Sequence, residues 1–353
     1  MNLYQSLQLS PFELKSRMKE GTTNKTKNYY IMVLFLRSVL MLLFSILFIV
    51  GSTSIFGQEQ SSLAVVLLCL LLSLRAVDFG YNVKESIVGL GLVFTILLIV
   101  PQIVGYLSPV IAFMLHFASL VTIFYITSYD RNYGNPSLYS FSYMFLVGTV
   151  QPWSTFGSRT ALMVTMYLLF ASIYYKKHRH KHEDHTFRSR MLGEKFLNEN
   201  NRFLLFLAFG MSLFFLVMHL FPLERFMWAG FACSSLLAGN HQQLKERSIA
   251  RLTGAISGSV LFLVVMRYLP SDYWLFVGPA AGFFLGFSTN YRNQTMINCF
   301  GALLLAQGIY GLEPAVSLRV LLNMFGLMFG ITYLLGMKKI FQYIGYKKLE
   351  QVN

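Results

Sequence analysis

Arginines inside apolar segments are the residues of this sequence whose type and position could do chemistry. Arg37 interrupts the first long apolar run, and Arg159 and Arg319 lie near the starts of two others. An arginine within a lipid-embedded helix costs about 2.5–3.5 kcal/mol on insertion scales, so its retention needs a reason. A guanidinium can hold a carboxylate through two parallel hydrogen bonds, which predicts a path for organic anions. The alternative is that these side chains reach lipid headgroups or cap neighbouring helices.

Other polar residues extend this candidate set. Arg251 precedes Gly254 and Gly258, and glycines four apart favour close helix packing. We interpret the glycines as packing residues, whereas Arg251 either serves topology or faces an anion entering from inside. Asn290 and Tyr291 lie in a polar turn between two apolar runs. The predicted substrate-binding residues are Arg37, Arg159, Arg251, Asn290, Tyr291 and Arg319.

No catalytic motif accompanies these residues. The sequence has no phosphate-binding glycine loop, no HExxH and no nucleophile elbow, so we predict neither an enzyme nor a cofactor. The charged stretch 176–202 contains alternating histidines, namely His178, His180, His182 and His185. Because lysine and arginine separate them and they do not share a helix face, we favour a solvated loop over a metal site. These histidines could also respond to pH.

Composition places these residues in a membrane. Of the 353 residues, 55% are hydrophobic and only 12% are charged, whereas soluble domains carry about 25% charged residues. The net charge of +14 is distributed over short loops, which is typical of membrane topology and argues against nucleic-acid binding. We predict an all-α polytopic membrane protein with about twelve transmembrane helices. The candidate spans are 30–50, 62–77, 86–103, 108–127, 138–150, 159–175, 203–221, 226–239, 252–269, 273–289, 295–310 and 316–337.

Loop charges predict the topology. With twelve crossings and a cytoplasmic amino terminus, most of the 29 lysines and arginines lie on the inner side. Both termini are then cytoplasmic. We predict that the protein lies in the plasma membrane and that membrane lipids are among its binding partners. The predicted parts are an amino-terminal segment 1–28 with a short helix over Pro11–Glu20, a membrane repeat 29–175, a basic loop 176–202, a membrane repeat 203–337 and a tail 338–353.

The two membrane segments resemble each other. Each final span begins close to an arginine, Arg159 in one half and Arg319 in the other, and Lys84-Glu85 after the second span corresponds to Lys245-Glu246. The turn that follows the fourth span matches in the same way, at 127–132 and 289–293. Because each half has an even number of crossings, we expect two parallel six-helix repeats related by an axis along the membrane normal.

The second half carries a family resemblance. Trp228-Ala229, then Arg251-x-x-Gly254-x-x-x-Gly258, Asn290-Tyr291 and Leu318-Arg319-Val320 occur in the order found in the fusaric acid resistance-like (FUSC) superfamily. The resemblance extends over about 203–337, and the first half follows it only in outline. It implies a six-helix membrane domain, used twice here, and export or permeation of organic anions, as in aromatic acid exporters and aluminium-activated malate transporters.

Two functions of different classes remain open. The first is a transporter or channel-like exporter of small organic anions, among them aromatic carboxylates. The second is a membrane scaffold that transports nothing and recruits an acidic partner protein or anionic headgroups through the basic loop 176–202. A homo-oligomer is compatible with either function.

Overall fold

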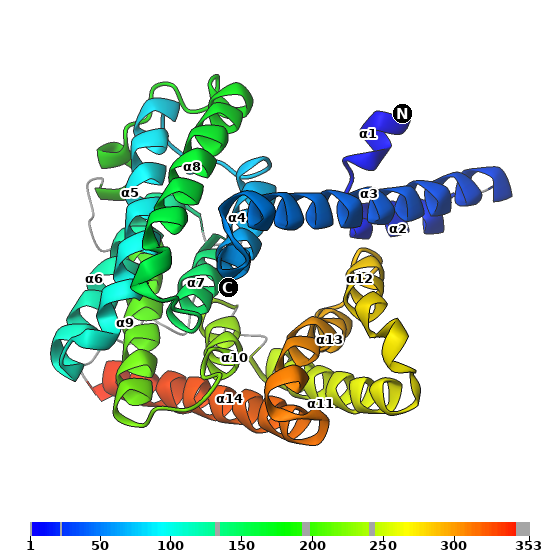
Figure 1. The fold of residues 1–353 in the computed structure, drawn as a ribbon. Coiled ribbons are helices and arrows are strands. Elements are labelled where there is room, and N and C mark those ends of the chain that lie inside the picture. Colours follow the sequence, from blue (N-terminus) through cyan, green and yellow to red (C-terminus); the bar gives the residue numbers. More distant parts are fainter. Residues whose placement is uncertain (1, 22, 131–134, 193–197, 240–243, 344–353) are drawn as a thin grey trace. The chain divides into compact units, whose positions relative to one another are not determined.

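The computed structural model of the chain describes residues 2–21, 23–130, 135–192, 198–239 and 244–343. These residues form helices joined by short turns, and no strand occurs among them (Figure 1). The all-α prediction is therefore confirmed. Each of the twelve predicted spans coincides with one helix: α3 (Asn24–Phe56), α4 (Ser61–Leu74), α5 (Val83–Ile103), α6 (Pro109–Thr127), α7 (Asn135–Val147), α8 (Phe156–His178), α9 (Glu199–Leu220), α10 (Met227–Leu237), α11 (Leu244–Tyr268), α12 (Trp274–Leu285), α13 (Tyr291–Tyr310) and α14 (Leu312–Tyr343).

Helix length limits which of these helices can cross a membrane. Among the described residues, seven helices are long and apolar enough: α3, α5, α6, α8, α9, α11 and α14. By contrast, α10 has 11 residues and α7 has 13, or roughly 16–20 Å at 1.5 Å per residue. The hydrocarbon core is about 30 Å thick, so neither helix can cross it unaided. Seven crossings are thus supported, and twelve crossings stay a prediction.

The helices group into two compact units. Unit 1 contains residues 1–48 and 242–324, and unit 2 contains residues 49–241 and 325–353. In unit 1, α11 and α12 both pack against α13. In unit 2, α6 packs along α9, and α5 packs along α8 as Figure 1 shows. The predicted domain boundaries follow the sequence repeat and are not tested by this grouping.

The amino-terminal helix α2 (Pro11–Glu20) begins and ends where the sequence predicted. Ser10 accepts a hydrogen bond from the backbone nitrogen of Glu13, and the Glu13 carboxylate accepts one from the backbone nitrogen of Ser10. The hydrogen bond from the Ser10 backbone nitrogen is the main cause that lowers the pKa of Glu13. A shorter helix, α1 (Leu3–Leu7), precedes α2. Leu14 of α2 is fully buried against Val33 and Leu34 of α3, so α2 is packed into unit 1.

Two glycines set the approach of α11 to α13. A Cβ placed on Gly254 would lie 2.6 Å from the carbonyl oxygen of Arg292, and one on Gly258 would overlap the backbone of Met296. Real Cβ atoms do not approach a backbone so closely, so this helix crossing requires glycine at both positions. The packing role predicted for Gly254 and Gly258 is confirmed.

Candidate functional site

Arg159 is the most unusual of the predicted residues. It is the fourth residue of α8, and only 2% of its surface is exposed. Its Nε and Nη2 atoms are buried and have no hydrogen-bond partner among the described residues. The residue before Arg159 is also polar. Ser158 Oγ accepts a 3.1 Å hydrogen bond from Gln60 Nε2. Gln60 Oε1 is buried and has no hydrogen-bond partner among the described residues. This end of α8 therefore holds a buried cation and an unused acceptor.

Arg251 and Arg319 lie together in unit 1. Arg319 is 5% exposed, and its charge interacts with that of the half-buried Arg251. Asn323 connects the two residues, because its Oδ1 accepts a 3.2 Å bond from Arg251 Nε and its Nδ2 donates a 2.8 Å bond to the Arg319 carbonyl. Two of the six predicted residues therefore lie in one polar cluster, which joins α11 to α14.

The remaining predicted residues have other surroundings. Asn290 is the N-cap of α13, and its Oδ1 accepts a 3.0 Å bond from the backbone nitrogen of Arg292. The ring of Tyr291 lies under the guanidinium of Arg247, 5.0 Å from the ring centre. Arg37 is half-buried on α3 in unit 1. Arg159 belongs to unit 2, whereas the other five belong to unit 1.

Each unit contains a cavity. The cavity of unit 1, of about 930 Å³, has aromatic and aliphatic walls from α11, α12 and α13 and polar groups from Lys15, Ser288, Thr289 and Asn293. The cavity of unit 2, of about 320 Å³, lies between the middle of α6 and the ends of α5, α7, α9 and α10. We call it the histidine pocket, and it is lined by Pro101, Gln102, Val104, Gly105, Tyr106, His116, Val147, Val150, Phe215, Met218, His219 and Phe226. None of the six predicted residues lines either cavity.

The sequence analysis missed His116 and His219. His116 is 4% exposed in the middle of α6, and His219 is near the end of α9. Among ionisable residues within the spans, only arginines and carboxylates were considered as functional residues when the sequence was interpreted. The same rule, that an ionisable residue within a span suggests function, would have selected both histidines.

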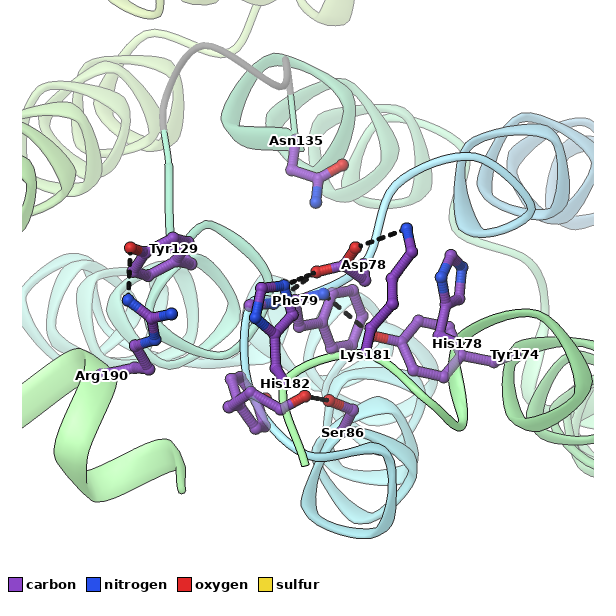
Figure 2. Close-up of polar contacts among 12 residues, drawn as sticks. Asp78, Phe79, Ser86, Tyr129, Asn135, Tyr174, His178, Lys181, His182 and Arg190 are labelled. Atoms are coloured by element: carbon purple, nitrogen blue, oxygen red, sulfur yellow. Dashed lines mark hydrogen bonds and ion pairs between the residues drawn. The ribbon is translucent and has the colours of Figure 1, made fainter. Parts of the chain in front are cut away.

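The described part of the basic loop folds back onto unit 2 (Figure 2). Lys181 Nζ lies 3.0 Å from Asp78 Oδ2, and His182 Nε2 lies 3.2 Å from Asp78 Oδ1, so both side chains converge on the turn between α4 and α5. The His185 carbonyl accepts a 2.7 Å bond from the backbone nitrogen of Asn82. The described part of the loop is therefore held against unit 2 by these contacts. The part of it at 193–197 lies outside the described residues, as does 131–134 of the matching turns.

Further contacts hold the loop in place. The backbone nitrogen of Phe187 donates to the Glu85 carboxylate. Arg190 Nη1 donates a 2.7 Å bond to the Tyr129 hydroxyl, and the guanidinium also stacks over the Tyr129 ring at 4.6 Å (Figure 2). The described residues contain no group of three or more histidine, cysteine, aspartate or glutamate side chains that could share a metal ion.

Asp78 is the electrostatic centre of this contact. Burial by itself would raise the pKa of its carboxyl group, but the hydrogen bond and charge of Lys181 lower it more strongly. The backbone nitrogen of Gly80 and the His182 ring also lower this pKa. The net pKa of Asp78 is below its ordinary value, so the carboxylate is ionised at neutral pH and attracts the basic loop.

Comparison with known proteins identifies the second half of the chain. Residues 212–333 match the fusaric acid resistance protein-like family. This match lies within the stretch 203–337 whose motifs carry the resemblance. No curated protein and no solved structure matches the chain. Residues 212–333 are therefore similar to the fusaric acid resistance protein-like family, in a chain whose described residues include seven helices long and apolar enough to cross a membrane.

Proposed function

We propose that this chain transports small organic anions across a plasma membrane, as an exporter or a channel-like conduit. The observation that carries the proposal is the burial of Arg159 without a partner among the described residues. A buried charge without a partner is strongly destabilising, so a residue that serves stability alone would not be placed in this way. An anion that visits the site would supply the missing hydrogen bonds.

A carboxylate matches the unused atoms of Arg159. Its two oxygens accept parallel hydrogen bonds from two guanidinium nitrogens in one plane, and such charge-assisted bonds are about twice as strong as neutral ones. Arg319 occupies the corresponding position of the second half and is also buried, together with Arg251. Two buried arginines at repeat-related positions support anion contact in each half.

The finer topology forms part of the same proposal. Two parallel six-helix repeats with twelve crossings and both termini in the cytoplasm would place Arg159 and Arg319 at symmetry-related points. The shorter helices α4, α7, α10 and α12 would then enter the membrane beside the longer ones, buried in protein rather than exposed to lipid. Aromatic carboxylates are the proposed substrate class, in keeping with the aromatic walls of the unit 1 cavity.

A liposome assay tests the proposal. Purified protein in liposomes at pH 8 should release labelled 4-hydroxybenzoate faster than protein-free liposomes do. Arg159→Gln keeps an amide but removes the charge, and loss of a charged hydrogen bond of about 1.5–3 kcal/mol predicts a fall in flux of about 10-fold to 100-fold. Arg267→Gln is the matched control, because Arg267 is 66% exposed and pairs with Glu313 at the surface. Equal flux in Arg159→Gln and Arg267→Gln would remove Arg159 from the mechanism.

The scaffold alternative is separated from transport by shortening the basic loop. If residues 188–197 are replaced by a short glycine-serine linker, transport predicts unchanged flux. A scaffold predicts no flux in either protein, together with loss of binding to vesicles that contain anionic lipid.

A further inference from the structure

The histidine pocket has the features of a built ligand site. Its volume of about 320 Å³ is at the lower end of the range of about 300–1,000 Å³ typical of small-molecule pockets. Its walls come from 101–150 in the first half of the sequence and from 215–226 in the second half. All of these residues belong to unit 2. The pocket therefore has room for one small molecule between segments of both halves.

His116 is held in a fixed orientation in this pocket. Its ring stacks on Phe215 with 4.1 Å between ring centres and an interplanar angle of 10°. Its Nδ1 hydrogen-bonds to the Tyr143 hydroxyl over 2.8 Å. The other ring nitrogen, Nε2, has no hydrogen bond to any described residue. One imidazole nitrogen is thus used for positioning, and the other is left for a ligand.

Gln102 supplies a second unused polar atom. It is 2% exposed, and its Nε2 donates a 2.7 Å bond to the Gln151 carbonyl. This bond fixes the orientation of the amide, and Oε1 is buried without a partner among the described residues. A buried acceptor without a donor destabilises the fold, and a ligand with an O–H or N–H group would supply the missing hydrogen bond.

Among the residues that line the pocket, the groups that can carry a positive charge are histidines. His219 of α9 lines the pocket and is near enough to His116 for their charges to interact. The other titratable groups at the pocket are tyrosines: Tyr143 on α7 bonds to His116, and Tyr106 in the short turn after α5 lines the pocket. No lysine, arginine, aspartate or glutamate is among the lining residues. A proton on either histidine would therefore be the sole positive charge in an otherwise neutral pocket.

We propose that the histidine pocket binds one small carboxylic acid, with one proton shared between the carboxyl group and the His116–His219 pair. The carboxyl group offers in one plane the acceptor for a histidine N–H and the donor for Gln102 Oε1. When the ligand arrives as the carboxylate, the complex takes up one proton from solvent, so the bound form is a carboxylic acid whose O–H donates to Gln102 Oε1 beside a neutral imidazole. This inference rests on the proposed transport of organic anions and adds a proton-linked binding step to it.

Calorimetric titration of the full chain in detergent tests this site, with 4-hydroxybenzoate as the probe. Binding at pH 6 should be at least 10-fold tighter than at pH 8. Titrations at pH 7.5 in buffers of different ionisation enthalpy should show uptake of about one proton per ligand. 4-Hydroxybenzyl alcohol, which has the same ring without the carboxyl group, should not bind.

Variants connect this binding to the pocket. His219→Phe and His116→Phe should each lose the difference between pH 6 and pH 8, and His116→Phe keeps a ring to stack on Phe215. His180→Phe is the control, because this loop histidine is 77% exposed, and it should bind as the wild type does. An affinity that does not change with pH, or equal pH dependence in the pocket variants and the wild type, would overturn the site.

The liposome assay distinguishes failure of the site from failure of transport. Unchanged flux in Arg159→Gln together with proton-linked binding in the pocket would leave the site standing and reject Arg159 as a transport residue. Flux that depends on Arg159 together with pH-independent binding would reject the site and leave transport standing.

Discussion

Arg159→Met should make the folded protein more stable, because it removes a buried cation that has no partner among the described residues. Methionine keeps most of the apolar stem and leaves no charge to desolvate. An arginine within a span costs about 2.5–3.5 kcal/mol on insertion scales, and a swap that keeps the side-chain volume costs less than about 1.5 kcal/mol. We therefore expect a net gain of about 1–3 kcal/mol in the free energy of unfolding.

The assay is reversible unfolding in mixed micelles by sodium dodecyl sulfate, followed by fluorescence of the three tryptophans. In the unfolded chain Arg159 is hydrated, so the cost of removing its charge from water is present only in the folded state. Arg267→Met, at an exposed surface pair, should change the free energy of unfolding by less than about 1 kcal/mol. The comparison of these two variants isolates the effect of burial from that of charge.

The anion supplies a second readout. At pH 8, where the histidine pocket binds weakly, 4-hydroxybenzoate at 100 times its Kd should stabilise the wild type by about 2.7 kcal/mol. Arg159→Met should gain less than about 1 kcal/mol from the same concentration. A variant that is less stable than the wild type, or one that the anion stabilises equally, would show that Arg159 has a structural role and would refute the reasoning.

Three further predictions concern packing, the basic loop and the amino-terminal helix. Gly258→Ala should lower stability by about 1–3 kcal/mol in the same unfolding assay because the added Cβ meets the Met296 backbone, whereas Gly308→Ala, which faces open space, should be neutral or slightly stabilising. Asp78→Asn should increase amide hydrogen exchange over 181–187 at pH 7, because Lys181 loses its carboxylate; exchange that stays slow would contradict the ion pair. The pKa of Asp78 is lowered when the loop is docked. The carboxylate therefore stabilises the docked loop fully above its ordinary pKa of 3.8, and in the wild type this stabilisation is lost only as pH falls below that value. Ser10→Ala should cost about 1 kcal/mol of helix stability, seen as faster exchange over 11–20, and Ser16→Ala within the same helix is the control.

Local features of the fold could be predicted from sequence because their causes are local. Pro11–Glu20 was predicted from Ser10, Pro11 and Glu13, and these residues cap the helix by their own hydrogen bonds. The twelve apolar runs are helical because a chain in a membrane must satisfy its backbone internally. The packing role of Gly254 and Gly258 was predicted from their spacing of four residues, and both glycines lie against the backbone of α13.

The site depends on contacts between distant segments, which a single sequence does not show. Arg159 is near the start of its helix, where an arginine can equally well reach a headgroup, and only tertiary packing reveals that it is buried. Asn290 looked like a polar ligand, but its Oδ1 caps α13. The attachment of Lys181 to Asp78 joins residues separated by more than a hundred positions and has no local signature.

The directions of α5 and α8 show where Arg159 lies along unit 2 relative to the histidine pocket. Phe79, just before α5, contacts Tyr174 near the end of α8, and Phe94 contacts Phe170. The backbone nitrogen of Asn82, before α5, donates to the His185 carbonyl after α8, and Gln102 near the end of α5 donates to the Gln151 carbonyl before α8, so the two helices run antiparallel. The start of α8, with Arg159, is therefore at the same end of unit 2 as Gln102 near the end of α5.

The basic loop and Asp78 are at the opposite end of this helix pair, because Tyr174 precedes the loop and contacts Phe79. Arg159 and the histidine pocket are thus both at the end away from the loop. The carboxylate of Asp78 pairs with Lys181 and His182 at the other end, whereas Arg159 forms no ion pair among the described residues. An anion that reaches the end of unit 2 with Arg159 and the histidine pocket would therefore find a guanidinium for its charge and an imidazole for its proton.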